Sequence, residues 1–390
     1  MENNSNKKWL ILTLCCLGMA SMAITIQDLT PVSHAIQKAL DIDFGKLGFL
    51  MGAISIPGIF LSLPGGMLAD RWGKRTLIFA GYVLMILGAA LFTTKLGYNV
   101  LYLSRLISGI GCICISVLLP GIVTSYFKGK SLGMAMGIFN TALPLGSIVT
   151  LSFFGQIGNI IGPFRLFWIP AIFTSLVLIM SIFFLHGKEE QKPDSHKFEI
   201  PPLNSPIWIL GLIILFANMS TMGYVTIAPS YFTAQKFSIP VIGLMLSAVL
   251  WGTLFLSPVA GLLTSHWNMA KILIIGGCLF QGIWLILIPI KEIPLSLDLI
   301  FFTISAGVII TPVYILVPRV IPIRQLNMGY GIIMTAMMLG CFLGSSLSGL
   351  SVNYLGGFHA GFESLGFFSF AGAIAAIFLK REVYIIPKNR

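Results

Sequence analysis

Two charged side chains, Asp28 and Arg105, stand inside long apolar stretches of the sequence. A charge in an apolar environment is costly, so such a residue normally faces a partner, water or the protein interior. A carboxylate that has a cation as its partner can act as a protonation switch, because taking up a proton removes its charge. Two simpler interpretations stay open. Asp28 could be exposed at a helix end, and Arg105 could lie near the end of its helix and extend to the surface.

The other reactive residue types do not gather into patterns that catalyse reactions or bind metals. The six cysteines lie in apolar segments, and the five histidines are scattered over loops and helix ends. Neither set has the spacing of metal ligands. The sequence contains no Walker loop for a nucleotide phosphate, and no catalytic array of Ser, His and Asp or of paired carboxylates. We therefore expect no enzyme activity, no cofactor and no metal.

The composition is that of a membrane protein. Of the 390 residues, 56% are hydrophobic and only 9% are charged, whereas soluble domains carry about 25% charged residues. A soluble fold of this size needs polar surface to meet water, so a bilayer is the expected solvent. The basic residues stand in short clusters between apolar runs, without the aromatic residues of a nucleic-acid site, so nucleic-acid binding is excluded.

Twelve apolar runs are long enough to cross a bilayer, which takes about 20 residues per helix. The first run follows two lysines, as a signal peptide would, but its counterpart in the second half of the chain identifies it as a transmembrane helix. It is longer than a bilayer is thick, so we expect it to be bent or tilted. The predicted fold class is an all-α membrane protein with spans at residues 9–36, 45–67, 76–95, 98–126, 131–156, 165–185, 206–233, 239–264, 270–290, 294–320, 327–353 and 361–380.

The chain has two similar halves on either side of a polar stretch. Residues 186–205 are rich in charges and prolines and predict a surface linker. We expect two six-helix bundles, over residues 1–185 and 206–390, because self-similarity indicates a duplicated helical unit. A pattern of glycine, leucine and tryptophan recurs 195 residues later in the chain: Gly66, Leu68 and Trp72 in the first half, and Gly261, Leu263 and Trp267 in the second.

Lysines and arginines are distributed unevenly between the two sets of loops. With both termini inside, 17 of the 24 lie in cytoplasmic segments, six lie in outer segments, and Arg105 lies within a span. Such a bias towards the inside determines the orientation of membrane proteins. We therefore expect a multi-pass protein of the bacterial inner membrane with cytoplasmic N and C termini. The net charge of +11 then needs no anionic partner.

The loop after the second span, residues 65–75, reads Gly-Gly-Met-Leu-Ala-Asp-Arg-Trp-Gly-Lys-Arg. It closely resembles the loop motif of the major facilitator superfamily, G-x-L-A-D-R-x-G-R-K. In that family the loop is implied to hold the two halves together on the cytoplasmic side, through ion pairs weak enough to break and re-form. The resemblance thus implies a conformational latch, in which one glycine permits close helix approach and another a tight turn. The latch residues are Gly66, Asp70, Arg71, Gly73, Lys74 and Arg75.

The fourth span resembles a second pattern of the same family, R-x-x-x-G-x-G. Arg105 is followed by Gly109 and Gly111, and the resemblance implies that this arginine acts in proton coupling or substrate binding. The first and fourth helices both line the central cavity of the resembled fold. We therefore hypothesise that Asp28 and Arg105 face this cavity and interact, directly or through the substrate, with Asp28 as the protonation switch.

Uncharged polar residues within the spans are further candidates for contacts with a cargo. Polar groups at membrane depth need partners and tend to face inward, although a single residue of this kind more often makes a hydrogen bond that packs two helices. Their lack of charge favours a cargo that is neutral, zwitterionic or singly charged. The candidates are Asn140, Asn218, Thr221, Tyr224, Gln281, Thr311 and Tyr314.

The resemblance implies a secondary active transporter of a small organic solute or ion, which works by alternating access between its two bundles. Protons are the expected coupling ion, symport or antiport the expected mode, and a monomer in the lipid bilayer the expected form. The alternatives are an uncoupled facilitator, a lipid flippase or a solute receptor on the same scaffold.

Overall fold

The structure is a computed structural model that describes residues 2–63, 73–127, 130–185, 202, 205–267, 269–290, 295–322 and 325–380. Within these ranges the chain is helical and contains no strand. Twelve spans in the described part of the chain are long and apolar enough to cross a membrane, from Lys7–Leu40 to Phe358–Ile377. The fold class and the number of spans predicted from the sequence are confirmed.

Contacts between residues divide the chain into two compact units. The first unit comprises Met1–Leu40 and Ile56–Ser195, and the second comprises Asp41–Ser55 and His196–Arg390. The division by contacts therefore differs from the predicted division by sequence at residues 41–55, which are separated from the rest of the second unit by residues 56–195. The predicted linker, 186–205, lies outside the described residues except at positions 202 and 205.

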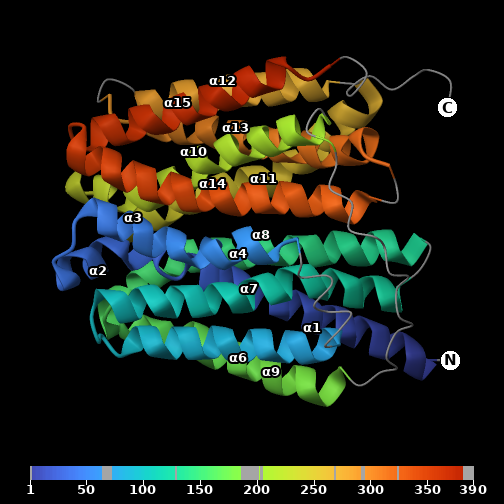
Figure 1. Ribbon diagram of the computed structural model, residues 1–390. Coiled ribbons are helices and arrows are strands. Elements are labelled where there is room, and N and C mark those ends of the chain that lie inside the picture. The colour runs from blue at the N-terminus through green and yellow to red at the C-terminus, as the bar shows by residue number, and fades with distance from the viewer. Residues whose placement is uncertain are drawn as a thin grey trace. The chain divides into compact units, whose positions relative to one another are not determined.

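The first unit is built on long helices that are apolar on all sides, as expected where lipid replaces water. Helix α6 packs against α7 and α9, and α1 packs against α7, α8 and α9. Large aromatic side chains such as Tyr82, Phe139 and Phe167 are fully buried between them. The helices are α1 (Glu2–Gln27), α2 (Ser33–Leu40), α4 (Ile56–Leu61), α6 (Lys74–Thr93), α7 (Tyr98–Tyr126), α8 (Lys130–Ile161) and α9 (Trp168–Phe184), and the 3-10 turns are η1 (Thr30–Val32) and η3 (Arg165–Phe167) (Figure 1).

The long first span is interrupted rather than continuous. Helix α1 ends at Gln27, the chain turns at Asp28 and Leu29, and α2 begins only after the short turn η1. Pro31 lies in the first turn of η1. Because proline has no backbone N–H, it cannot donate to the carbonyl one turn earlier, which opposes an unbroken α-helix. The interruption places Asp28 at the open end of α1.

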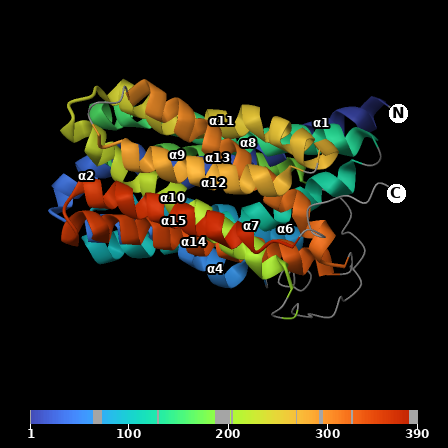
Figure 2. The ribbon, with the colours of Figure 1, turned by 90° about the horizontal axis from the view of Figure 1, so that it is seen from above.

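In the second unit, α10 packs against α14 and α15, and the three helices lie side by side (Figures 1 and 2). The segment 41–55 joins this unit because α3 packs on α14, where the Phe44 backbone N–H donates to Asn353 Oδ1 at 3.1 Å. The Asp43 carboxylate caps α3 by accepting from the Lys46 backbone N–H. The elements are α3 (Phe44–Gly52), η2 (Ala53–Ser55), α10 (Ile207–Ala234), α11 (Ile239–Trp267), α12 (Ala270–Leu287), α13 (Leu295–Val320), α14 (Leu326–Tyr354) and α15 (Phe358–Ile377).

The same close helix contact recurs in both units. A Cβ at Gly146 of α8 would lie 2.9 Å from the Ala20 carbonyl oxygen of α1. A Cβ at Gly340 of α14 would likewise meet the Leu215 carbonyl oxygen of α10. Ala20 and Leu215 are 195 positions apart, which is the spacing of the sequence repeat. The first and fifth membrane spans of each half of the sequence therefore approach through a glycine, as duplicated units would.

Candidate functional site

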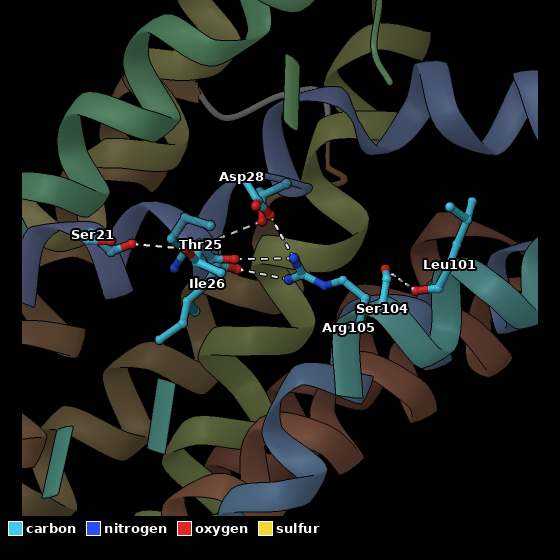
Figure 3. A network of polar contacts seen from close by, with 9 residues as sticks. Ser21, Thr25, Ile26, Asp28, Leu101, Ser104 and Arg105 are labelled. Carbon is cyan, nitrogen blue, oxygen red and sulfur yellow. Dashed lines mark hydrogen bonds and ion pairs between the residues drawn. The ribbon is translucent and has the colours of Figure 1, made fainter. Parts of the chain in front are cut away.

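Asp28 and Arg105 meet inside the first unit. The Arg105 Nη1 donates to Asp28 Oδ1 at 2.7 Å, which makes a salt bridge between the end of α1 and the second turn of α7 (Figure 3). A charge-assisted hydrogen bond of this length is among the stronger kinds in proteins. The two residues are 77 positions apart in the sequence, so it is the packing of α1 against α7 that brings them together.

Arg105 also binds the backbone at the end of α1. Its Nη1 donates to the Thr25 carbonyl at 3.1 Å, and its Nη2 donates to the Ile26 carbonyl at 3.2 Å (Figure 3). The last carbonyls of a helix have no partner within it and carry a partial negative charge. A guanidinium is suited to this place because it is planar and has several donors. Arg105 therefore neutralises the Asp28 carboxylate and caps the interrupted helix at once.

Both side chains are removed from the surface. The exposed fraction is 1% for Asp28 and 2% for Arg105, so Asp28 is not an exposed helix-end residue and Arg105 does not extend to the surface. Arg105 Nε is also buried, and it has no hydrogen-bond partner among the described residues. Buried charges are costly unless they are paired and hydrogen-bonded. The pair is therefore stable only while Asp28 is ionised, and protonation of Asp28 would leave a buried guanidinium without its counter-charge.

Buried hydroxyl groups near this site bond to the backbone of α1 and to α9. The Thr25 hydroxyl donates to the Ser21 carbonyl at 3.0 Å, and the hydroxyl groups of Ser21 and Thr174 lie 2.6 Å apart, which links α1 to α9. All three side chains are buried. These hydrogen bonds hold the last turns of α1 in place, so that its terminal carbonyls stay directed at Arg105.

The predicted latch is described only at its end. Gly66, Asp70 and Arg71 lie outside the described residues. Gly73 precedes α6 with a φ of 82°, a conformation that favours glycine. Lys74 and Arg75 are the first two residues of α6.

The remaining cargo candidates have different surroundings. Asn140 is exposed on α8, and Thr311 is half-buried on α13. Tyr224 of α10 is fully buried beside Phe302, with ring centroids 4.6 Å apart, and its hydroxyl has no hydrogen-bond partner among the described residues. Since these surroundings differ, each candidate needs its own interpretation.

Gln281 joins three helices of the second unit. Its Nε2 donates to the Thr221 hydroxyl of α10 at 3.0 Å, and its Oε1 accepts from the Ser369 hydroxyl of α15 at 3.2 Å. Ser369 shares its single hydroxyl proton with the Cys278 carbonyl, which lies 2.7 Å from its Oγ. Gln281 is completely buried. Since both ends of its amide are already bonded to the protein, packing explains Gln281 and Thr221 better than contact with a cargo does.

We expect Gln281→Leu to lower the unfolding free energy by about 1 kcal/mol, because each hydrogen bond between membrane helices contributes about 0.6 kcal/mol. Binding of a cargo should be unchanged. The measurement is unfolding of the purified protein together with ligand affinity. An unchanged stability with a lost affinity would assign Gln281 to the cargo instead.

Asn218 and Tyr314 lie in a second polar site of the second unit, where each has a sulfur atom as a partner of its side-chain oxygen. Tyr314 Oη lies 3.9 Å from Met334 Sδ, and Asn218 Oδ1 lies 3.9 Å from Cys341 Sγ. The sequence reasoning missed Met334 and Cys341 as site residues. The several methionines in the sequence of α14 could have indicated a binding surface, since methionine is common at binding surfaces that adapt to their ligands.

The sequence matches the model of the Major Facilitator Superfamily over residues 10–240 and 207–389. The chain belongs to this superfamily. The members of this superfamily are membrane transporters and not enzymes. The resemblance seen in the loop motif and around Arg105 is thereby confirmed at the level of the family.

Among curated relatives, this member of the superfamily is similar to the quinolone resistance protein NorB of Staphylococcus aureus strain Newman. The two are 29% identical over 212 residues, which is 53% of this chain and 45% of NorB. The chain therefore matches less than half the length of this relative. The same values hold for NorB of strain COL.

Two solved structures share the fold of this superfamily member over nearly its whole length. The human organic anion transporter MFSD10 (TETRAN) has a TM-score of 0.69 at 16% identity, covering 95% of this chain and 99% of MFSD10. A bacterial homologue of the human lysosomal transporter Spinster has a TM-score of 0.73 at 16% identity, covering 94% and 95% of the two chains. At these identities the likeness concerns the fold alone.

Proposed function

We propose that this transporter is a secondary active one, which moves a small organic solute across the bacterial inner membrane and is driven by protons. The observation that supports the coupling is the buried pair of Asp28 and Arg105 at the interruption of the first span. Ionisable residues inside a membrane normally belong to ion, proton or substrate pathways. In this proposal Asp28 is the group that takes up and releases the proton.

The coupling follows from how Arg105 is held. While Asp28 is ionised, the pair is neutral and α1 is bound to α7. When Asp28 takes up a proton, the guanidinium keeps its two backbone carbonyls but loses its counter-charge. A positive charge in an apolar interior then favours water or an anionic group of the cargo. Protonation would thereby change the side of the membrane to which the site is open, or the cargo that it binds.

The remaining parts of the proposal concern organisation. The two bundles, residues 1–185 and 206–390, would alternate the access to a site in each monomer, and both termini would be cytoplasmic. The residues Gly66, Asp70, Arg71, Gly73, Lys74 and Arg75 would act as the latch between the states. The similarity to a quinolone resistance protein supports export of an organic compound as the direction to test first.

The first test uses the full chain in proteoliposomes. A thermal-shift screen selects a bound organic compound, and its exchange and its accumulation are then measured with and without a pH gradient. We expect Asp28→Asn to keep exchange of the compound between the two sides but to lose accumulation driven by the gradient, because an amide cannot take up the proton.

Asp41→Asn is the matched control, since Asp41 is exposed, and it should behave as the wild type does. Gradient-driven accumulation that survives in Asp28→Asn would show that another group couples the proton. Accumulation by the wild type that ignores the pH gradient would favour a facilitator. A bound compound that never exchanges would favour a receptor.

A further inference from the structure

Five side chains from three helices form what we call the aromatic–sulfur face of the second unit. Three of them, Tyr330, Met334 and Cys341, are spaced four and seven residues apart on α14, so they share one side of this helix. Tyr314 of α13 contacts Met334, and Asn218 of α10 contacts Cys341. Helices α10, α13 and α14 pack against one another, so the face is continuous across them.

The two tyrosine rings of this face are nearly parallel. The ring centroids of Tyr314 and Tyr330 are 6.1 Å apart and the rings are inclined by 18°. Tyr314 is half-buried and Tyr330 is 36% exposed. A flat, partly exposed pair of rings is a surface on which a third aromatic ring can stack in an offset arrangement. The thioether of Met334 beside it can adapt to rings of different outline.

The polar groups of the face are satisfied only weakly. Among the described residues, the partner of the Tyr314 hydroxyl is a thioether sulfur, and the partner of the Asn218 Oδ1 is a thiol, each at 3.9 Å. A thioether is a weak acceptor and a thiol is a weak donor. The Asn218 Nδ2, by contrast, donates to the Ile214 carbonyl at 2.9 Å. One donor and one acceptor therefore remain available for stronger partners.

Gln281 in the same unit has stronger partners than the polar groups of the face. Both ends of its amide bond to oxygen atoms of neighbouring hydroxyl groups, at 3.0 and 3.2 Å. Polar groups at membrane depth carry a cost when they lack good partners. A ligand that brings an acceptor to Tyr314 and a donor to Asn218 would remove that cost at the aromatic–sulfur face, whereas the Gln281 amide already has an oxygen partner at each end.

The five side chains of the face include no charged group. We propose that the aromatic–sulfur face binds the cargo, and that it takes a planar, uncharged aromatic ring system that carries a hydrogen-bond acceptor and a donor. Stacking on the tyrosine rings holds the plane of the ligand, Tyr314 donates to its acceptor, and Asn218 accepts from its donor. The inference rests on the proposed transport function, because the ligand of this face is the transported cargo.

The experiment uses the full chain, purified in detergent, and the fluorescent probe 7-amino-4-methylcoumarin, which is planar and uncharged and carries a carbonyl and an amine. We expect saturable binding in a fluorescence titration. Tyr314→Phe and Asn218→Leu should each weaken it about fivefold, the value of one neutral hydrogen bond. The probe 2-methylnaphthalene has neither donor nor acceptor, so its affinity should be the same for both variants as for the wild type.

Tyr354→Phe is the matched control, since Tyr354 is 77% exposed at the end of α14, and it should bind the coumarin as the wild type does. Tyr314→Phe removes a single oxygen atom, and its thermal midpoint reports whether the fold is kept. The proposal is overturned if the coumarin does not saturate, or if neither Tyr314→Phe nor Asn218→Leu changes its affinity.

The outcomes also separate this inference from the proposed function. The protein could fail to bind the coumarin and still transport another compound under a proton gradient. That result would overturn the proposal that the aromatic–sulfur face binds the cargo, and it would leave the transport proposal standing. Coumarin binding with the expected losses, but without exchange of the probe in proteoliposomes, would support the face as a binding site and contradict the transport of its ligand.

Discussion

We expect Arg105→Ala to abolish the proposed proton-driven transport and to lower the unfolding free energy by about 3–5 kcal/mol, the cost of leaving a buried charge without its partner. The substitution exposes Asp28 and the carbonyls of Thr25 and Ile26 to an apolar interior at the same time. The measurements are unfolding of the purified protein and accumulation of a bound compound under a pH gradient.

Two further variants separate charge from geometry. Arg105→Lys keeps the charge but replaces a planar fork with a single ammonium group, so it should recover stability only in part. The double variant Asp28→Asn with Arg105→Gln removes both charges, and it should be more stable than Arg105→Ala without regaining proton coupling. Arg165→Ala is the control, since Arg165 is exposed. A stability of Arg105→Ala equal to that of this control would contradict the capping role.

Gly344→Val should destabilise the second unit by about 3 kcal/mol, the upper end of the usual cost of overpacking. A Cβ at Gly344 would meet the Met219 carbonyl oxygen and lie 2.6 Å from the Met219 Cα. These atoms belong to the backbone of α10, so they cannot rotate away as a side chain would. The helices α10 and α14 would have to separate, which would also disturb the aromatic–sulfur face.

Gly276→Val is the matched control because a Cβ at Gly276 of α12 would meet nothing within 4 Å. Both variants exchange the same residue types within a helix, so their intrinsic effects on helix formation are equal. The difference in their thermal midpoints therefore reports the α10–α14 contact alone. Equal midpoints would mean that the two helices do not approach closely at Gly344.

The number and the type of the elements could be predicted from the sequence because they depend on local composition. A run of about 20 apolar residues requires a membrane, and the backbone then requires a helix. The excess length of the first span and Pro31 within it both indicate its interruption. The cost of a charge among apolar residues likewise makes Asp28 and Arg105 candidates by residue type and position in the sequence alone.

The repeat predicted duplicated halves, and it could not show that residues 41–55 contact the second unit instead of the first. That grouping depends on a long-range contact, since Phe44 bonds to Asn353, which lies 309 positions away in the sequence. The composition of a segment does not show which distant segment it will contact.

The roles of the polar residues were decided only by the tertiary structure. As residue types, Gln281, Asn218 and Tyr314 were equal candidates, but the first is bonded to oxygen at both ends and the other two contact sulfur. Arg105 reaches backbone carbonyls, which no residue type can predict. The sequence by itself therefore determined twelve membrane helices and two charges within them, Asp28 and Arg105, to test as a pair. The packing of distant helices decided what each polar group bonds to, because hydrogen bonds depend on distances that only the folded chain sets.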